Sequence, residues 1–148
     1  MSFWRRSSNN WRTQVDEEVI YCQSPSHTDI ERAISAFRRC PGFNNEDAES
    51  IRDKLTRQPE DFQLFYSPPG IWAHTEIRRH SSQTSLWLHF AASEKNNLSE
   101  LKIYQKLLDS LSEYAKKQKC EVLFFYGRPG WCKVLKNCEH DTIFIKAL

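Results

Sequence analysis

The stretch from Ser85 to Tyr126 constrains the fold more than any other part of the sequence. An apolar run typical of a strand, Leu86 to Ala92, precedes a long helical pattern from Ser99 to Lys119. A second run, Val122 to Tyr126, is apolar at successive positions, which is typical of a strand with both faces covered. Strand, helix and strand at these lengths predict a crossover between two neighbouring parallel strands of one sheet.

Apolar spacing and turn residues predict the elements around this unit. Strands are expected over 15–22, 62–66, 71–78 and 142–148, and helices from Thr28 to about Cys40, over 45–57 and over 131–137. Thr28 and Glu31 are spaced as a capping box at the start of the first helix. The predicted order is β-α-α-β-β-β-α-β-α-β, an α/β (α+β) fold with a mixed sheet.

Composition limits the classes of protein to which the chain can belong. A length of 148 residues suits one domain, which we place at 15–148 after an arm over 1–14. A formal charge of +2 does not by itself indicate a nucleic-acid partner. No stretch has the roughly 18 apolar residues of a membrane span, and the N-terminus lacks the apolar core of a signal peptide. Five cysteines without paired spacing indicate reduced thiols, so we expect a cytoplasmic protein.

The arm combines Trp4, Arg5, Arg6, Trp11 and Arg12. Tryptophan and arginine often carry the binding energy of protein interfaces, so we expect these residues to bind a partner or a second copy of the chain. The simpler interpretation is a tail that lies on its own domain. Single-stranded nucleic acid could stack on the two tryptophans, but the sequence has no recognised nucleic-acid-binding signature.

The order of elements resembles the fold of the GNAT N-acetyltransferases over 15–148, including Val134 to Asn137 before the last strand. This resemblance implies a three-layer fold in which the fourth and fifth strands separate. It implies that acyl-CoA lies between them, with its pantetheine paired to the backbone of Phe90, Ala91 and Ala92. It also implies that the pyrophosphate lies at the N-terminus of the following helix, where free N–H groups favour anions.

The loop expected to hold the pyrophosphate departs from the glycine-rich pattern of that family. The sequence from Ser93 to Glu100 has no glycine and carries two carboxylates, which would repel phosphate. Lys95, Asn96 and Asn97 are the residues left to bind it. The family's proton-donating tyrosine in its fourth helix is also missing, because Val134 or Leu135 occupies the matching position.

Candidates for catalysis are few. Glu76 and His74 share one face of the predicted strand over 71–78, and His89 lies on the next strand; each could act as a general base or be an ordinary polar residue. Tyr126, like Tyr104, is a candidate proton donor or simply a packed aromatic. No metal site is predicted, because the spacing of Cys120, Cys132, Cys138 and His140 matches no common zinc pattern.

The sequence therefore predicts a GNAT-like domain that has lost catalysis, needs no cofactor and acts through protein contacts. A resemblance to GNAT-like internal virion proteins of tailed phages implies a virion or assembly component, in a virion or the host cytoplasm. The alternative is an N-acetyltransferase that moves an acetyl group from acetyl-CoA to an amine.

Overall fold

The computed structural model describes residues 5–6, 12–14, 19–68, 70–94, 101–126, 138–139 and 143–148. Within this part of the chain, one mixed sheet has the strand order β1-β2-β3-β4-β5-β6-β7-β9-β8. Its strands are β1 (Arg5–Arg6), β2 (Arg12–Gln14), β3 (Ile20–Cys22), β4 (Phe62–Ser67), β5 (Ile71–Arg79), β6 (Thr84–Ser93), β7 (Val122–Tyr126), β8 (Cys138–Glu139) and β9 (Ile143–Ala147). The only parallel pair among them is β6 with β7.

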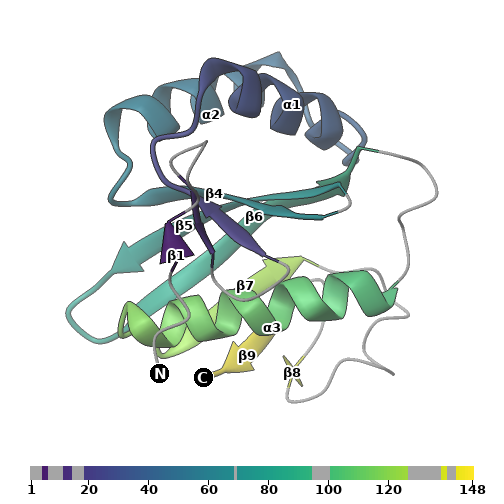
Figure 1. The fold of residues 1–148 in the computed structure, drawn as a ribbon. Helices are drawn as coiled ribbons and strands as arrows, with labels where there is room; N and C mark the ends of the chain where they lie inside the picture. The colour runs from purple at the N-terminus through teal and green to yellow at the C-terminus, as the bar shows by residue number, and fades with distance from the viewer. Residues whose placement is uncertain are drawn as a thin grey trace.

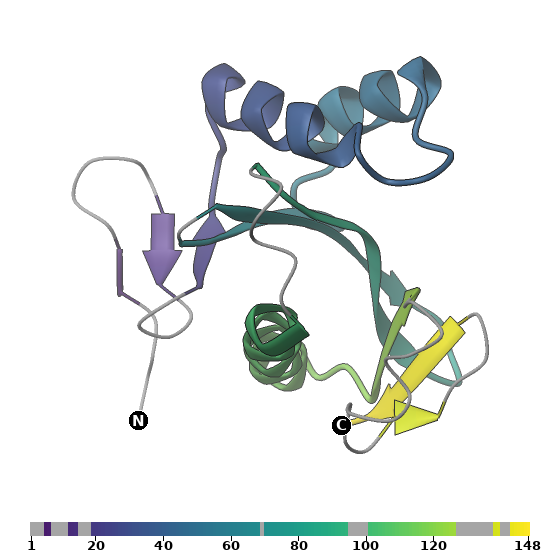
Figure 2. The same cartoon turned by 90° about the vertical axis from the view of Figure 1, so that its right-hand side faces the viewer.

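Helices cover both faces of the sheet, as Figures 1 and 2 show. Helices α1 (His27–Phe37) and α2 (Asn45–Arg57) lie on one face, and α3 (Leu101–Lys117) lies on the other. The layer under α1 and α2 buries Ile34, Phe37, Ile51, Leu64 and Trp72. The layer under α3 buries Phe65, Ile71, Leu86, Leu111 and Phe125. Burying each of these large side chains stabilises the fold by about 1.5–3 kcal/mol.

The predicted crossover is confirmed. Strand β6 runs into α3, and α3 returns the chain to β7, which pairs in parallel with β6 from Ser85–Val122 to Leu88–Phe125. The three consecutive strands β4, β5 and β6 form an antiparallel meander. The predicted helix over 131–137 lies outside the described residues. The domain boundary after Gln14 remains a prediction, and β2, which ends at this residue, pairs with β3.

The predicted capping box at the start of α1 is wrong. The helix begins one residue earlier, at His27, and its N-cap is Ser26, whose Oγ accepts a hydrogen bond from the Asp29 N–H at 3.1 Å. Ser26 has the extended backbone that an N-cap needs. Glu31, the other half of the predicted box, instead pairs with Arg52 of α2 at 2.9 Å.

Candidate active site

Strand β6 extends well beyond its pairing with β7. Their last parallel pair is Leu88 with Phe125, whereas β6 continues to Ser93 and pairs with β5 as far as Ile71. The end of β6 therefore has no strand partner on its β7 side within the described residues. Phe90, Ala91 and Ala92, the residues proposed from the resemblance to pair with pantetheine, lie in this segment.

The backbone of this segment has a definite orientation. The Glu94 N–H donates to the Gly70 carbonyl at 2.7 Å, on the β5 side. Because backbone groups alternate along a strand, the N–H and carbonyl groups of Ser93 and Ala91 point away from β5, to the side of β6 on which β7 lies. Two side chains after α1 contact them there: Arg39 Nη1 donates to the Ser93 carbonyl at 3.0 Å, and Cys40 Sγ lies 3.6 Å from the Ala91 carbonyl oxygen.

A β-bulge at His89 changes which side chains share a face. Phe90 pairs with His74 and Leu88 pairs with Thr75, so His89 is an extra residue of β6 that has no counterpart on β5. A bulged residue interrupts the strict alternation of faces. His89 consequently lies beside Phe90, on the α1/α2 face, where it meets side chains of β5.

His89 and Glu76 form the central pair of this face. His89 Nε2 lies 2.7 Å from Glu76 Oε1, and Arg78 Nε donates to the same oxygen at 3.0 Å. Burial raises the pKa of Glu76, but hydrogen bonds from His89 and Arg78 outweigh this effect, and the net pKa is lowered. Burial lowers the pKa of His89 more than the neighbouring carboxylate raises it.

The lowered pKa values of Glu76 and His89 define the protonation states of both groups near neutral pH. Glu76 is ionised and can only accept, so the neutral His89 ring donates its Nε2 proton to Glu76. The other ring nitrogen, Nδ1, then has a free lone pair with which to accept a proton. A carboxylate that orients an imidazole in this way is a common arrangement for a general base.

His74 is not suited to the same role. It is 3% exposed, and its Nδ1 lies 3.2 Å from the Gln63 carbonyl, to which the neutral ring donates. Burial lowers its pKa to about 3, so it does not take up a proton near neutral pH. Its ring stacks on Phe62 with a centroid distance of 6.0 Å, so its contacts are those of a core residue.

Next to the pair lies an aromatic group that the sequence analysis missed. The guanidinium of Arg78 lies 4.3 Å from the centroid of the Trp87 ring, and Trp87 stacks on Phe124 at 4.4 Å. Glu76 is opposite Trp87, and Trp87 is opposite Phe124, in the registers of β5, β6 and β7. These contacts depend on strand pairing, which residue patterns within one strand do not reveal.

One of the two loop carboxylates expected to repel phosphate is already paired. Glu94 Oε1 accepts hydrogen bonds from Trp72 Nε1 at 2.6 Å and from Arg32 Nη2 at 2.7 Å. Arg32 also lies over the Trp72 ring, 5.4 Å from its centroid. The positive charge of Arg32 therefore offsets the charge of Glu94 at the end of β6.

The remaining predicted residues are placed only in part. Lys95, Asn96, Asn97, Glu100, Trp4, Trp11, Cys132 and His140 lie outside the described residues. The backbones of Arg5 and Arg6 lie in β1, that of Arg12 in β2, that of Cys138 in β8 and that of Tyr126 at the end of β7. Tyr104 packs half-buried against the α3-side core, and Cys120 is buried within it.

None of the helices described above is both long and apolar enough to cross a membrane. No three His, Cys, Asp or Glu side chains among the described residues gather closely enough to hold a metal ion.

Comparisons with known proteins identify the fold. No family model and no curated protein matches this sequence. Among solved structures, the NatC complex bound to Gag peptide and CoA aligns with a TM-score of 0.65 and 9% identity, over 88% of this chain and 99% of that chain.

Two single acetyltransferases align in the same way. The paia N-acetyltransferase from Thermoplasma acidophilum, in complex with coenzyme A, gives a TM-score of 0.58 and 17% identity, over 88% of this chain and 98% of that chain. A putative GNAT-family acetyltransferase from Desulfovibrio desulfuricans gives 0.59 and 10%, over 86% and 94%. Together with the mixed sheet and the parallel pairing of β6 with β7, which ends midway along β6, these alignments show that the chain has the GNAT fold.

Proposed function

We propose that this chain is an N-acyltransferase that transfers an acetyl group from acetyl-CoA to an amine. The observation that carries the proposal is the Glu76–His89 pair, a carboxylate-oriented base beside the point where the pairing of β6 with β7 ends. The fold neighbours crystallised with coenzyme A support the choice of donor.

The donor would bind along the edge of β6 that extends beyond its pairing with β7. The backbone groups of Ala91 and Ser93 point away from β5, so an extended amide chain would pair there as an additional strand does, in place of the Arg39 and Cys40 side chains. Lys95, Asn96, Asn97 and the start of α3 are the proposed phosphate contacts. Bound acetyl-CoA supplies the thioester that the amine attacks.

The protein's own groups would handle the proton. His89 takes it from the acceptor amine, and the ionised Glu76 holds the ring and stabilises the positive charge that forms on it. Tyr126, at the end of β7, is the proposed candidate for protonating the leaving thiolate. Desolvation keeps His89 neutral and able to accept, because burial lowers its pKa.

Calorimetry with acetyl-CoA on the purified chain tests donor binding. We expect a Kd in the micromolar range, weakened several-fold by Asn97→Asp because this variant adds a negative charge at the proposed phosphate contact. Transfer to amines, followed as thiol release, should be lost in Glu76→Gln. No binding at millimolar acetyl-CoA would overturn the proposal.

One observation favours a second function, a non-catalytic domain that acts through protein contacts. Arg39 and Cys40 already occupy the Ser93 and Ala91 carbonyls to which pantetheine would bind. The proposed contact surface is the arm with Trp4, Arg5, Arg6, Trp11 and Arg12, as in a virion or assembly component. Sedimentation at micromolar concentration should then show an oligomer that the double variant Trp4→Ala/Trp11→Ala dissociates, whereas a monomer would count against this function.

A further inference from the structure

The guanidinium of Arg78 is only partly used by the protein. Its Nε binds Glu76 at 3.0 Å, but Nη1 and Nη2 form no hydrogen bond or ion pair with any residue in the described ranges. The side chain is 38% exposed, so these donors are accessible to a ligand. Two parallel N–H donors on a planar guanidinium match the two oxygens of a carboxylate.

Trp87 fixes the position of this group. The guanidinium lies 4.3 Å from the centre of the indole ring, and the indole ring also stacks on Phe124. An arginine that is held against an aromatic ring loses less conformational entropy when it binds an anion than a free surface arginine does. Arg78 is therefore oriented before any ligand arrives.

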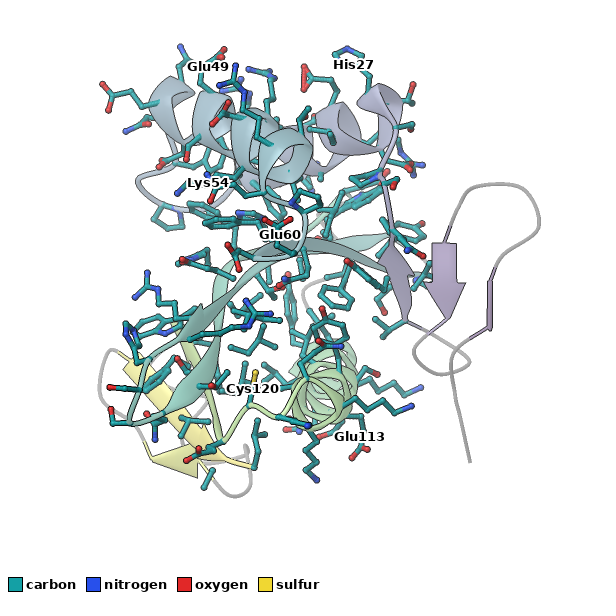
Figure 3. All side chains as sticks on the ribbon, turned by 90° about the vertical axis from the view of Figure 1, so that its left-hand side faces the viewer. His27, Glu49, Lys54, Glu60, Glu113 and Cys120 are labelled. Carbon is teal, nitrogen blue, oxygen red and sulfur yellow. The ribbon has the colours of Figure 1, made fainter. Side chains whose placement is uncertain are left out.

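A second positive charge lies nearby. Lys54 reaches from α2 toward the sheet (Figure 3), and its Nζ lies 4.7 Å from the centroid of the Phe62 ring. Phe62 is opposite Glu76 in the register of β4 and β5. Lys54 forms no ion pair within the described part of the chain, and it lowers the pKa values of both His74 and His89 through its charge.

Among the described side chains whose charges act on His89, the charges consequently do not balance. Arg78 and Lys54 contribute two positive charges, and Glu76 contributes one negative charge. A site with this surplus attracts anions and repels cationic acceptors such as polyamines. The charge balance indicates that an amine acceptor carries a negative group of its own.

The spacing limits how far the two groups of such an acceptor can be apart. Arg78 Nε and His89 Nε2 contact the same oxygen of Glu76, at 3.0 and 2.7 Å, so these nitrogens are separated by no more than the sum of the two distances. The atoms that would contact a ligand, His89 Nδ1 and Arg78 Nη1 and Nη2, lie one position further along the same imidazole ring and the same guanidinium. A ligand that contacts both residues therefore needs its amine and its anionic group only a few bonds apart. An α-amino acid has this arrangement.

We propose that the acceptor is a free α-amino acid, whose carboxylate binds the Nη1 and Nη2 donors of Arg78 while its amine lies beside His89. This inference rests on the proposed acyltransferase function and specifies its substrate class. In the reaction the amine nitrogen forms a bond to the acetyl carbon, the carbon–sulfur bond breaks, the amine proton goes to His89, and coenzyme A leaves as the thiol.

Matched pairs of acceptors provide the test. Glycine, leucine and phenylalanine are each compared with the amine that lacks the carboxylate: methylamine, 3-methylbutylamine and phenethylamine. With acetyl-CoA as donor, we expect kcat/KM to favour at least one amino acid over its amine by about 10- to 100-fold, the size expected for a hydrogen bond to a charged group. Arg78→Gln should abolish this preference, and Arg78→Lys should retain only part of it.

Arg79→Gln is the matched control. Arg79 is adjacent in sequence, carries the same charge and pairs with Asp61 at 2.7 Å. Burial raises the pKa values of Tyr114 and Cys120, on the α3 side of the sheet, and the charge of Arg79 acts against this rise. The preference for amino acids should survive this substitution.

The possible results separate the two proposals. Transfer to the simple amines that equals or exceeds transfer to the amino acids would leave the acyltransferase function standing and overturn the amino-acid inference. If neither class is acetylated, the acyltransferase proposal fails, and amino-acid binding is then measured directly by ligand-observed NMR. Binding that Arg78→Gln removes would support the amino-acid site, and no binding would overturn it.

Discussion

His89 of β6 and Glu76 of β5 lie 2.7 Å apart on adjacent strands, and His89 is also the extra residue of a bulge in β6. In an unbroken strand the faces alternate, and Leu88 and Phe90 would share a face. The bulge instead turns Phe90 onto the α1/α2 face, which His89 already shares with Trp87.

Glu76→Gln should lower kcat for acetyl transfer by about 100-fold or more, within the usual range for general-base catalysis. A glutamine cannot stabilise the protonated His89 as a carboxylate does. The KM for acetyl-CoA should change little, because the proposed donor edge is at Ala91 and Ser93. The measurement is steady-state kinetics with a saturating amine.

Glu113→Gln is the control for this variant. Glu113 lies on α3, the helix that covers the opposite face of the sheet (Figure 3). Its side chain is 55% exposed. This substitution should leave kcat unchanged. An unchanged kcat in Glu76→Gln as well would rule out the proposed role of Glu76.

His74 should make the fold less stable in acid. Its pKa is lowered to about 3 by burial, whereas an exposed histidine has a pKa near 6.5. Between these two values the unfolded chain binds a proton that the folded protein does not. The free energy of unfolding should therefore fall as pH falls from 6.5 toward 3, by about 1.4 kcal/mol per pH unit for this group.

His74→Asn isolates this contribution, because asparagine can still donate to the Gln63 carbonyl but does not titrate. Urea unfolding at pH 6.5, 5.5 and 4.5 should show a shallower loss of stability in the variant than in the wild type. Other groups, Glu76 among them, titrate in both proteins, so the difference in slope reports His74. Equal slopes would show that His74 is not the buried neutral group described here.

The order of elements could be predicted from sequence because it depends on local patterns. The alternation of β5 and the apolar run of β7 are visible within a few residues, and both strands appear as expected. The start of α1 was misplaced because Ser26 and Thr28 are both good N-caps, and sequence alone does not tell which one has an extended backbone.

The candidate site could be predicted only in part. Glu76 and His89 were recognised as possible bases, but their contact depends on strand register, which no local pattern reveals. The stack of Arg78 on Trp87 was missed for the same reason. Arg32 and Glu94 are 62 residues apart in sequence, and only the packing of α1 on the sheet shows that they pair.

Glu94 should stabilise the fold through Trp72. Trp72 is fully buried, and its Nε1 donates to Glu94 Oε1 at 2.6 Å. Glu94→Ala leaves this N–H without its acceptor, which should lower the free energy of unfolding by about 1–3 kcal/mol. Urea unfolding gives the value, and Glu113→Ala, an exposed truncation on α3, should stay within about 0.5 kcal/mol of the wild type. A loss in Glu94→Ala no larger than in this control would contradict the assignment.

Arg39 and Cys40 should compete with acetyl-CoA for the edge of β6. Their side chains contact the Ser93 and Ala91 carbonyls, and these contacts must break before pantetheine can pair with the same oxygens. The double variant Arg39→Ala/Cys40→Ala should therefore bind acetyl-CoA about 3- to 10-fold more tightly, as the loss of one or two competing hydrogen bonds implies. Calorimetry at constant salt measures the change.

Arg38→Ala is the control for the lost positive charge. Arg38 is the preceding residue, and it binds Asn45 Oδ1 at 3.1 Å rather than the edge of β6. Its removal should weaken the binding of the anionic donor slightly, if it has any effect, because it only lowers the local positive charge. Weaker binding in the double variant than in Arg38→Ala would mean that Arg39 contacts the donor directly and does not compete with it. Equal affinity in the double variant and the wild type would show that the donor does not use this edge.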